Sequence, residues 1–128
     1  MAIPALHRGV IFRAEHDDSY PFWGDNEPPR SKLCLVFNAD PVQEGDVHYF
    51  LATSKVDRYR ESPSILSDVL ILPPASYPFF PRETLIDFRR LCVVSIEKLV
   101  YDAGGRINTS ERMDGDSRYL STFDVARK

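Results

Sequence analysis

Two groups of polar and charged residues have types and spacing that could act on a phosphate. In the first, the apolar run in "HYFLATSK" ends on two hydroxyls and a cation, Thr53, Ser54 and Lys55. In the second, Asp87 and Arg89 are two positions apart, so an extended strand places both on one face. Cations and hydroxyls stabilise a phosphate oxyanion, and a carboxylate can accept or donate a proton. Both groups also have a structural interpretation, because Thr and Ser commonly end strands and an acid can pair with the cation beside it.

Further positive charges lie next to the ends of the expected strands. If these ends meet at one rim of the fold, an electropositive pocket of phosphate size forms beside Thr53 and Ser54. Taken singly, however, Lys and Arg at strand edges improve solubility and prevent edge pairing. The cations concerned are Arg30, Lys32, Lys55, Arg58, Arg60, Arg82, Arg89 and Arg90.

Motifs for other chemistries are absent from the sequence. The three histidines lie in separate segments and neither cysteine has a CxxC or histidine neighbour, so no metal site is expected. The sequence has no P-loop, no GxGxxG and no GxSxG, which leaves nucleotide hydrolysis and α/β-hydrolase chemistry without support. No cofactor is therefore expected. Cys34 and Cys92 each lie within an apolar run, which is typical of reduced, buried thiols.

Length and composition are typical of one soluble globular domain covering residues 1–128. The 128-residue chain is 43% hydrophobic and 27% charged, which excludes a wholly disordered or collagen-like protein. Its formal net charge of -3 gives no overall basic field, so a nucleic acid would have to be held by a local cluster of cations. No stretch approaches the ~18 apolar residues of a membrane span, and the first residues do not form a secretory signal. A cytoplasmic location without membrane contact is expected.

Short apolar runs between clusters of Pro, Gly, Asn and Asp predict a mainly β domain, a small antiparallel barrel. The turn residues of 38–46 predict that the second and third runs pair as an antiparallel ribbon. A single helical turn capped by Ser95 and a C-terminal helix capped by Asn108 or Ser110 are also expected. The strand candidates are residues 9–14, 32–37, 47–53, 68–72 and 84–94.

The order of these segments resembles the PemK/MazF family, the growth-inhibiting toxins of type II toxin-antitoxin systems. "RGVIF" from Arg8 is similar to the family's opening "RG", "SKLCLVF" to its "RPVLV" strand, and "ATSK" to its strand ending on "TS" or "TT". "LIDFRRLCVVSIEKL" resembles the arginine-bearing strand and the following "TIDxxxL", and "DAGGRI" resembles the turn into the C-terminal helix. The chain has Leu91 and Val10 where the family has acidic residues, and Lys32 where it has arginine.

The resemblance implies a fold and a function. The fold would be an SH3-like antiparallel barrel of the CcdB/MazF type, with five to seven strands and a C-terminal helix. The protein would be a homodimer that cuts single-stranded RNA without a metal and is neutralised by a cognate antitoxin protein. In that reaction the RNA 2′-OH attacks the neighbouring phosphate, so the site needs a proton acceptor, a proton donor and cations.

The resemblance also implies roles for individual residues. Arg89 would stabilise the phosphate, Thr53 would donate a hydrogen bond to the oxyanion, and Lys32 would supply a second cation. The base stays open, with Asp87 and His16 as candidates. The expected catalytic residues are therefore Arg89, Thr53 and Asp87, and the expected substrate-binding residues are Lys32, Ser54, Lys55, Arg30 and His16.

Two other functions fit the same barrel, and the sequence leaves open whether the chain is an enzyme. A catalytically silent binding module would hold a protein partner with the long aromatic loop that contains Tyr20, Phe22 and Trp23, and the missing acidic residues favour this function. A gyrase-directed toxin is the second, because barrels of this type include a gyrase poison. The aromatic segments "PFW" and "YPFFP" predict a dimer interface, or else pack beneath their own loops.

Overall fold

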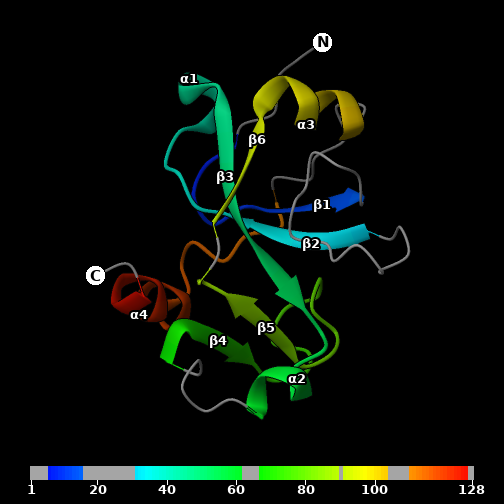
Figure 1. Cartoon of the computed structure of the whole chain (residues 1–128), viewed down its shortest axis with the longest axis vertical. Helices are drawn as coiled ribbons and strands as arrows, with labels where there is room; N and C mark the ends of the chain where they lie inside the picture. The colour runs from blue at the N-terminus through cyan, green and yellow to red at the C-terminus, as the bar shows by residue number, and fades with distance from the viewer. Residues whose placement is uncertain (1–5, 16–30, 62–66, 90, 104–109, 127–128) are drawn as a thin grey trace.

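Six antiparallel strands and four helices make up the part of the chain that the computed structural model describes, residues 6–15, 31–61, 67–89, 91–103 and 110–126 (Figure 1). The strands form one sheet in the order β1-β2-β3-β5-β4, and β6 pairs with β3. The expected mainly β fold with a C-terminal helix is thereby confirmed. The strands are β1 (Ile11–Glu15), β2 (Ser31–Val36), β3 (Asp46–Thr53), β4 (Val69–Leu72), β5 (Thr84–Asp87) and β6 (Cys92–Ser95). The helices are α1 (Pro41–Glu44), α2 (Asp57–Arg60), α3 (Ile96–Ala103) and α4 (Ser117–Ala126).

Strand β3 is the centre of the sheet, because it is long enough to pair with three other strands. Residues 49–52 pair with β2 along one edge. Along the other edge, residues 46–49 pair with β6 and residues 52–53 pair with β5. Figure 1 shows β3 running from the end of the molecule that carries α1 and α3 towards the end that carries α2. The last residue of β3, Thr53, therefore lies where the start of β5 and α2 come together.

The sheet is not closed into a barrel within the described residues, because β1 and β4 form its two ends. The outer edge of β1 is covered by the segment that leads into α4. Val10 and Arg112 form an antiparallel bridge, and the Met113 N–H donates to the Gly9 carbonyl at 2.8 Å. The C-terminal segment thus pairs with the residues around the start of β1.

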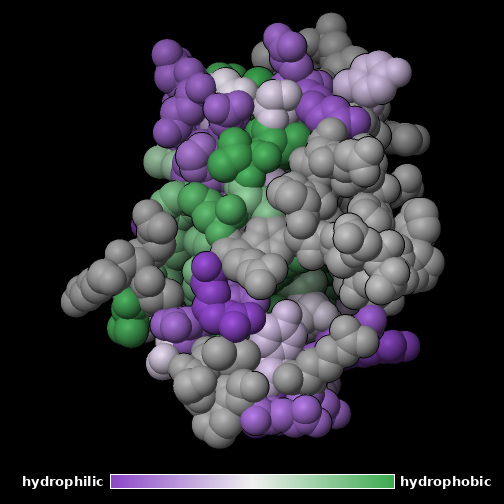
Figure 2. Space-filling view, viewed as in Figure 1, coloured by the Kyte–Doolittle hydropathy of each residue, from purple (hydrophilic) through white to green (hydrophobic). Residues whose placement is uncertain are grey.

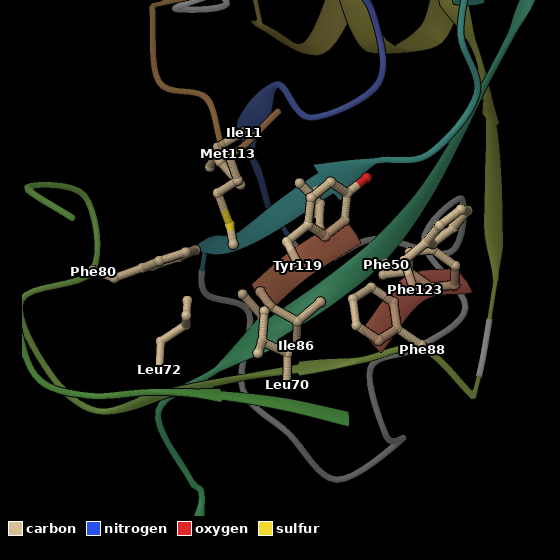
Figure 3. Close-up of a cluster of buried hydrophobic side chains, with 12 residues drawn as sticks. Ile11, Phe50, Leu70, Leu72, Phe80, Ile86, Phe88, Met113, Tyr119 and Phe123 are labelled. Atoms are coloured by element: carbon tan, nitrogen blue, oxygen red, sulfur yellow. The ribbon is translucent and has the colours of Figure 1, made fainter. Parts of the chain in front are cut away.

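One face of the sheet packs against α4 through a large aliphatic and aromatic core (Figure 3). Directly paired residues share a face, as Leu35 and Phe50 do between β2 and β3. Tyr119 and Phe123 are four positions apart, so they lie on the same side of α4, and they are 0% and 4% exposed. This core contains Ile11, Leu35, Phe50, Ala52, Leu70, Leu72, Phe80, Ile86, Phe88, Met113, Tyr119 and Phe123.

The opposite face carries a second core, which includes Ile96 and Leu99 of α3. Cys34 and Cys92 are buried in it and are not joined by a disulfide, in agreement with their apolar sequence context. The members of this core are Leu6, Val10, Phe12, Cys34, Val36, Val47, Tyr49, Cys92, Val94, Ile96 and Leu99. A smaller cluster beneath α2 joins Val56, Val69 and Leu85.

The segment expected to be a turn between β2 and β3 contains the short helix α1. The Asp40 carboxylate accepts from the Gln43 N–H at 3.2 Å and caps the helix, and Pro41 fits its first position. Gly45 ends the helix with a φ of 86°, which favours glycine. The antiparallel pairing of β2 with β3 is nevertheless confirmed.

The two larger helices differ from their expected forms. Ser95 caps α3 as expected, since its Oγ accepts from the Lys98 N–H at 3.1 Å, but α3 has 8 residues rather than a single turn. The expected cap of α4 at Asn108 or Ser110 is wrong. Asn108 lies outside the described residues, Ser110 precedes the helix, and α4 begins at Ser117. None of the described helices is long and apolar enough to cross a membrane.

Asp116 is the residue that caps α4. Its Oδ1 accepts hydrogen bonds from the backbone N–H groups of Arg118 at 2.8 Å and Tyr119 at 3.4 Å. These are the second and third positions of the helix, where an aspartate cap normally binds. Gly115 then lies outside the helix instead of weakening its interior.

The fifth expected strand, residues 84–94, is also wrong as a single element, because the chain turns within it. β5 ends at Asp87 and β6 begins at Cys92. The Asp87 carboxylate accepts from the Arg89 N–H at 3.0 Å, an interaction that stabilises a turn directly after the strand.

Candidate functional site

Thr53, Ser54 and Lys55 line a pocket of about 250 Å³ at the carboxyl end of β3, which we name the rim pocket. From the sequence, a pocket beside these residues was expected only on the condition that the strand ends meet at one rim. β1, β2, β3 and β5 all contribute to it, together with the turn that precedes β5. The complete described lining is Arg13, Leu33, Ala52, Thr53, Ser54, Lys55, Phe79, Phe80, Pro81, Arg82 and Thr84.

Strand pairing builds one wall of the rim pocket. Arg13 of β1 is opposite Leu33 of β2, and Leu33 is opposite Ala52 of β3. Directly paired residues lie on the same face of a sheet, so these three side chains form a row across three strands. This row lies on the same face of the sheet as the α4 core, because Ala52 belongs to that core. Arg13 is therefore held on a rigid sheet although its side chain is exposed.

The hydroxyl of Thr53 is fixed by the turn that follows β3. Its Oγ1 accepts a hydrogen bond from the Lys55 N–H at 3.1 Å. A hydroxyl that accepts in this way still has its own hydrogen to donate. Thr53 can consequently order the turn and offer a donor to a bound oxygen atom at the same time.

Positive charge dominates the rim pocket. Arg13, Lys55 and Arg82 contribute three cations, and no acidic side chain is among the described lining residues. Lys55 is half-buried and Arg82 is exposed. The Thr84 hydroxyl donates to the Arg82 carbonyl at 2.9 Å, which fixes the backbone of Arg82 where β5 begins. Guanidinium and ammonium groups beside hydroxyl donors can bind a phosphate or phosphodiester.

A smaller pocket of about 160 Å³ adjoins the rim pocket, because Ser54 and Lys55 line both. This second pocket contains the carboxylates of Asp57 and Glu83. Both carboxylates bind Arg60, with 2.5 Å between Nη2 of Arg60 and Oε2 of Glu83 and 3.2 Å between Nη1 and Oδ1 of Asp57. The hydrogen bonds that Arg60 donates to the Glu83 carboxylate raise the pKa of Arg60. The charge of Arg60 is thus directed to its own acidic partners.

Asp87 and Arg89 lie outside the rim pocket and bind each other. Nε of Arg89 donates to Oδ1 of Asp87 at 2.9 Å, and Nη2 donates to Oδ2 at 2.8 Å. This hydrogen-bonded pair raises the pKa of Arg89. The Arg89 guanidinium also lies 5.5 Å from the ring centroid of Tyr59 in α2. Asp87 and Arg89 are therefore not among the described residues that line the rim pocket with Thr53, and the catalytic roles expected for them stay predictions.

The other site residues named from the sequence are only partly described. Lys32 is in β2, where its backbone pairs with Ala14, but its side chain lies outside what the structure describes. Arg30 and His16 also lie outside the described residues. Of the expected substrate-binding residues, Ser54 and Lys55 are the ones that can be placed in the rim pocket.

Arg13 and Phe79 line the rim pocket but were not named as site residues from the sequence. The signal for Arg13 was present, because it is a charged residue within the apolar run of β1. Its meaning depends on the register with β2 and β3, which the sequence does not give. Arg82 was noted as a strand-end cation, and its place in the pocket confirms that part of the expected cluster.

The "YPFFP" segment packs mainly against its own molecule. Phe80 is 2% exposed and belongs to the α4 core. The Tyr77 hydroxyl donates to the Asp116 carboxylate. Of the two alternatives for this segment, packing beneath its own loop therefore describes Phe80. Phe79 is half-buried, and both rings line the rim pocket.

No group of three or more His, Cys, Asp and Glu side chains suited to a metal ion occurs in the described part of the chain. Comparison of the sequence with models of known protein families gives no match. None of the curated proteins matches it either.

Proposed function

We propose that the protein is a metal-independent endoribonuclease toxin of the PemK/MazF type, which binds single-stranded RNA in the rim pocket. The main support is the gathering of Arg13, Lys55 and Arg82 around the hydroxyls of Thr53 and Ser54. Such a set matches the charge and the hydrogen-bonding needs of a phosphodiester. The order of sequence motifs supports the family, and the proposed fold is its SH3-like barrel.

The proposed reaction is an internal transesterification. The RNA 2′-oxygen attacks the adjacent phosphorus and loses its proton to a base. The bond from phosphorus to the 5′-oxygen breaks, and this oxygen takes up a proton, so the products are a 2′,3′-cyclic phosphate and a 5′-hydroxyl. Arg13, Lys55 and Arg82 stabilise the extra negative charge on the phosphorane, and Thr53 donates a hydrogen bond to one of its oxygens.

The proton acceptor is assigned on sequence grounds. Asp87 binds Arg89 outside the rim pocket, so we favour the other candidate, His16. In the sequence, His16 directly follows Glu15, the last residue of the strand that supplies Arg13. His is the side chain whose ordinary pKa is closest to neutrality, which suits a general base.

The proposal includes a dimer, an antitoxin partner and a cytoplasmic location, as the family resemblance implies. Leu91 and Val93, beside and within β6, expose 37% and 46% of their surface. In Figure 2 apolar residues gather between hydrophilic ends of the molecule. The exposed side chains of Leu91 and Val93 are a candidate contact for a second copy of the chain.

A second candidate is a binding protein on the same fold that does not cut RNA. The observation that favours it is the lack of any carboxylate or imidazole among the described residues that line the rim pocket. Such a protein would retain RNA through the same cations without supplying a base.

Cleavage assays separate these functions. The purified protein should cut a pool of single-stranded RNA in EDTA, and an oligonucleotide with 2′-deoxyribose at the cleaved position should stay intact. Arg82→Ala should lower the rate by about 10²-fold, the scale for removal of a group that stabilises transition-state charge. Arg112→Ala is the matched arginine control, because Arg112 is exposed and is not among the described lining residues, and its folded fraction should cut at nearly the wild-type rate. RNA that binds but stays intact would support the binding protein, and RNA that neither binds nor breaks would overturn both proposals.

A further inference from the structure

The side chain of Phe79 forms an aromatic wall of the rim pocket. It is half-buried, in contrast to its neighbour Phe80, which is 2% exposed in the α4 core. Figure 3 shows Phe80 directed to the core side chains of the sheet. Both phenylalanines line the rim pocket, but Phe80 is a buried member of the core, whereas Phe79 packs against the core and keeps part of its surface exposed.

A ring stack holds Phe79 in place. The rings of Tyr77 and Phe79 are stacked, with centroids 5.0 Å apart and an angle of 21° between their planes. Phe80 meets Phe79 edge to face at 4.8 Å and 72°. The Phe80 N–H donates to the Tyr77 carbonyl at 3.0 Å and closes the turn that presents Phe79. The exposed part of Phe79 is therefore supported from two sides.

Helix α4 anchors this stack. The Tyr77 hydroxyl donates to Asp116, the residue that caps α4. Asp116 also binds the Arg118 guanidinium, at 2.8 Å between Nη2 and Oδ2. Tyr77 is consequently tied to a charged group at a fixed helix end. An aromatic surface that is already ordered loses little conformational entropy when a flat ligand packs on it.

Phe79 lines the rim pocket together with the cations Arg13, Lys55 and Arg82, a combination that suits a nucleic-acid ligand. Sites for single-stranded nucleic acid combine cations for the backbone with aromatic side chains for the bases, and duplex bases cannot reach such a ring. We infer that Phe79 is a stacking platform for one unpaired nucleobase, next to the phosphate held by Lys55 and Arg82. The inference rests on the proposed RNA function and defines its substrate as unpaired RNA.

Binding of an uncleavable RNA tests the platform. The probe is a fluorescent single-stranded RNA with 2′-fluoro at every position, and its affinity for the full chain is measured by anisotropy. Phe79→Ala should weaken binding about tenfold, whereas Phe79→Tyr keeps the ring and should bind within about twofold of wild type. Val125→Ala is the surface control, since Val125 is 60% exposed and lies on α4 outside the pocket. Equal thermal midpoints for the variants would show that the fold is kept.

A series of abasic probes adds a readout that a structural role for Phe79 would not produce. Each probe lacks one nucleobase, and removal of the stacked base should weaken wild-type binding while leaving Phe79→Ala almost unaffected. Arg82→Ala should instead reduce the salt dependence of binding, because it removes a phosphate contact.

The outcomes separate this inference from the proposed function. Wild-type affinity in Phe79→Ala, or equal affinity for a duplex of the same sequence, would overturn the platform while leaving RNA cleavage standing. If Phe79→Ala weakens binding as expected but the wild-type protein does not cut natural RNA, the stacking platform would be supported and the nuclease function overturned. A wild-type protein that binds none of the probes would overturn both.

Discussion

The guanidinium of Arg89 binds the carboxylate of Asp87 through two parallel hydrogen bonds, 2.9 Å and 2.8 Å long. The Arg89 backbone N–H adds a third bond to the same carboxylate at 3.0 Å. The Asp87 side chain is 8% exposed, so its charge depends on these donors rather than on water. The pair thus closes the turn after β5.

This geometry predicts that the pair contributes to stability. Asp87→Ala and Arg89→Ala should each lower the free energy of unfolding by about 2 kcal/mol. The first removes the acceptor of all three hydrogen bonds, and the second leaves the buried Asp87 carboxylate without its guanidinium. Urea unfolding of both variants and of the double variant measures the coupling between the two residues. If Arg89→Ala unfolds like wild type and yet abolishes RNA cleavage, Arg89 has the catalytic role that the family resemblance implies.

Gly9 and Gly45 form a matched pair for a prediction on backbone strain. Both have a positive φ, 99° and 86°. A Cβ at Gly9 would lie 2.4 Å from Cβ of Asp114, whereas a Cβ at Gly45 would have nothing within 4 Å. Gly45→Ala should therefore lower the free energy of unfolding by about 1 kcal/mol, because the new side chain meets only the strain of the left-handed backbone.

Gly9→Ala should cost more, about 3 kcal/mol or above, because it adds a clash with residue 114 to the same backbone strain. The clash would displace the segment that covers β1, including the buried Met113. Urea midpoints of the two variants test this difference, and equal losses would contradict the close packing of Gly9 against Asp114.

The lowered pKa of Asp116 predicts that the protein loses stability in acid. Burial raises its pKa, but hydrogen bonds from Arg118 and Tyr77 outweigh burial and lower the pKa from 3.8 to about 2. A carboxylate with a lowered pKa stabilises the fold above its unfolded pKa, and this contribution disappears as the pH falls from about 4 to 2. The loss should be about 2 kcal/mol. Asp116→Asn should flatten the pH dependence of unfolding in this range, and an unchanged slope would show that other carboxylates cause it.

Most of the fold could be predicted because strand runs carry local signals. The runs ending at Thr53 and Leu72 have the β-branched and aromatic residues that strands favour, and both are strands. The break between β5 and β6 was missed because residues 84–94 are apolar on either side of it. The turn there depends on the side chain of Asp87, a contact that strand propensity does not encode.

For the candidate site, the sequence could predict only which residues lie together because they are consecutive in the chain. Thr53, Ser54 and Lys55 are consecutive and line one pocket. Asp87 and Arg89 also share a short segment, but they bind each other and are not among the described residues that line that pocket. Arg13 joins it through pairing across two strands, so its role depends on a register that emerges only in the folded sheet.

Thr53 allows the most specific catalytic prediction. Its Oγ1 accepts from the Lys55 N–H, and its hydrogen is proposed to bind a phosphate oxygen in the transition state. Thr53→Val keeps the shape but removes both interactions, and it should lower the cleavage rate about tenfold, less than loss of a cation such as Arg82. Thr53→Ser keeps the hydroxyl and should restore most of the rate.

The Michaelis constant separates catalysis by Thr53 from mere ordering of its turn. Loss of a transition-state donor lowers kcat and leaves KM almost unchanged, whereas a disordered Lys55 would raise KM because the cation helps to bind the ground-state phosphate. Initial steady-state rates over a range of concentrations of one defined RNA, with EDTA present, provide both constants for Thr53→Val and Thr53→Ser. A Thr53→Val protein that raises KM at constant kcat would assign the residue to positioning of Lys55 alone.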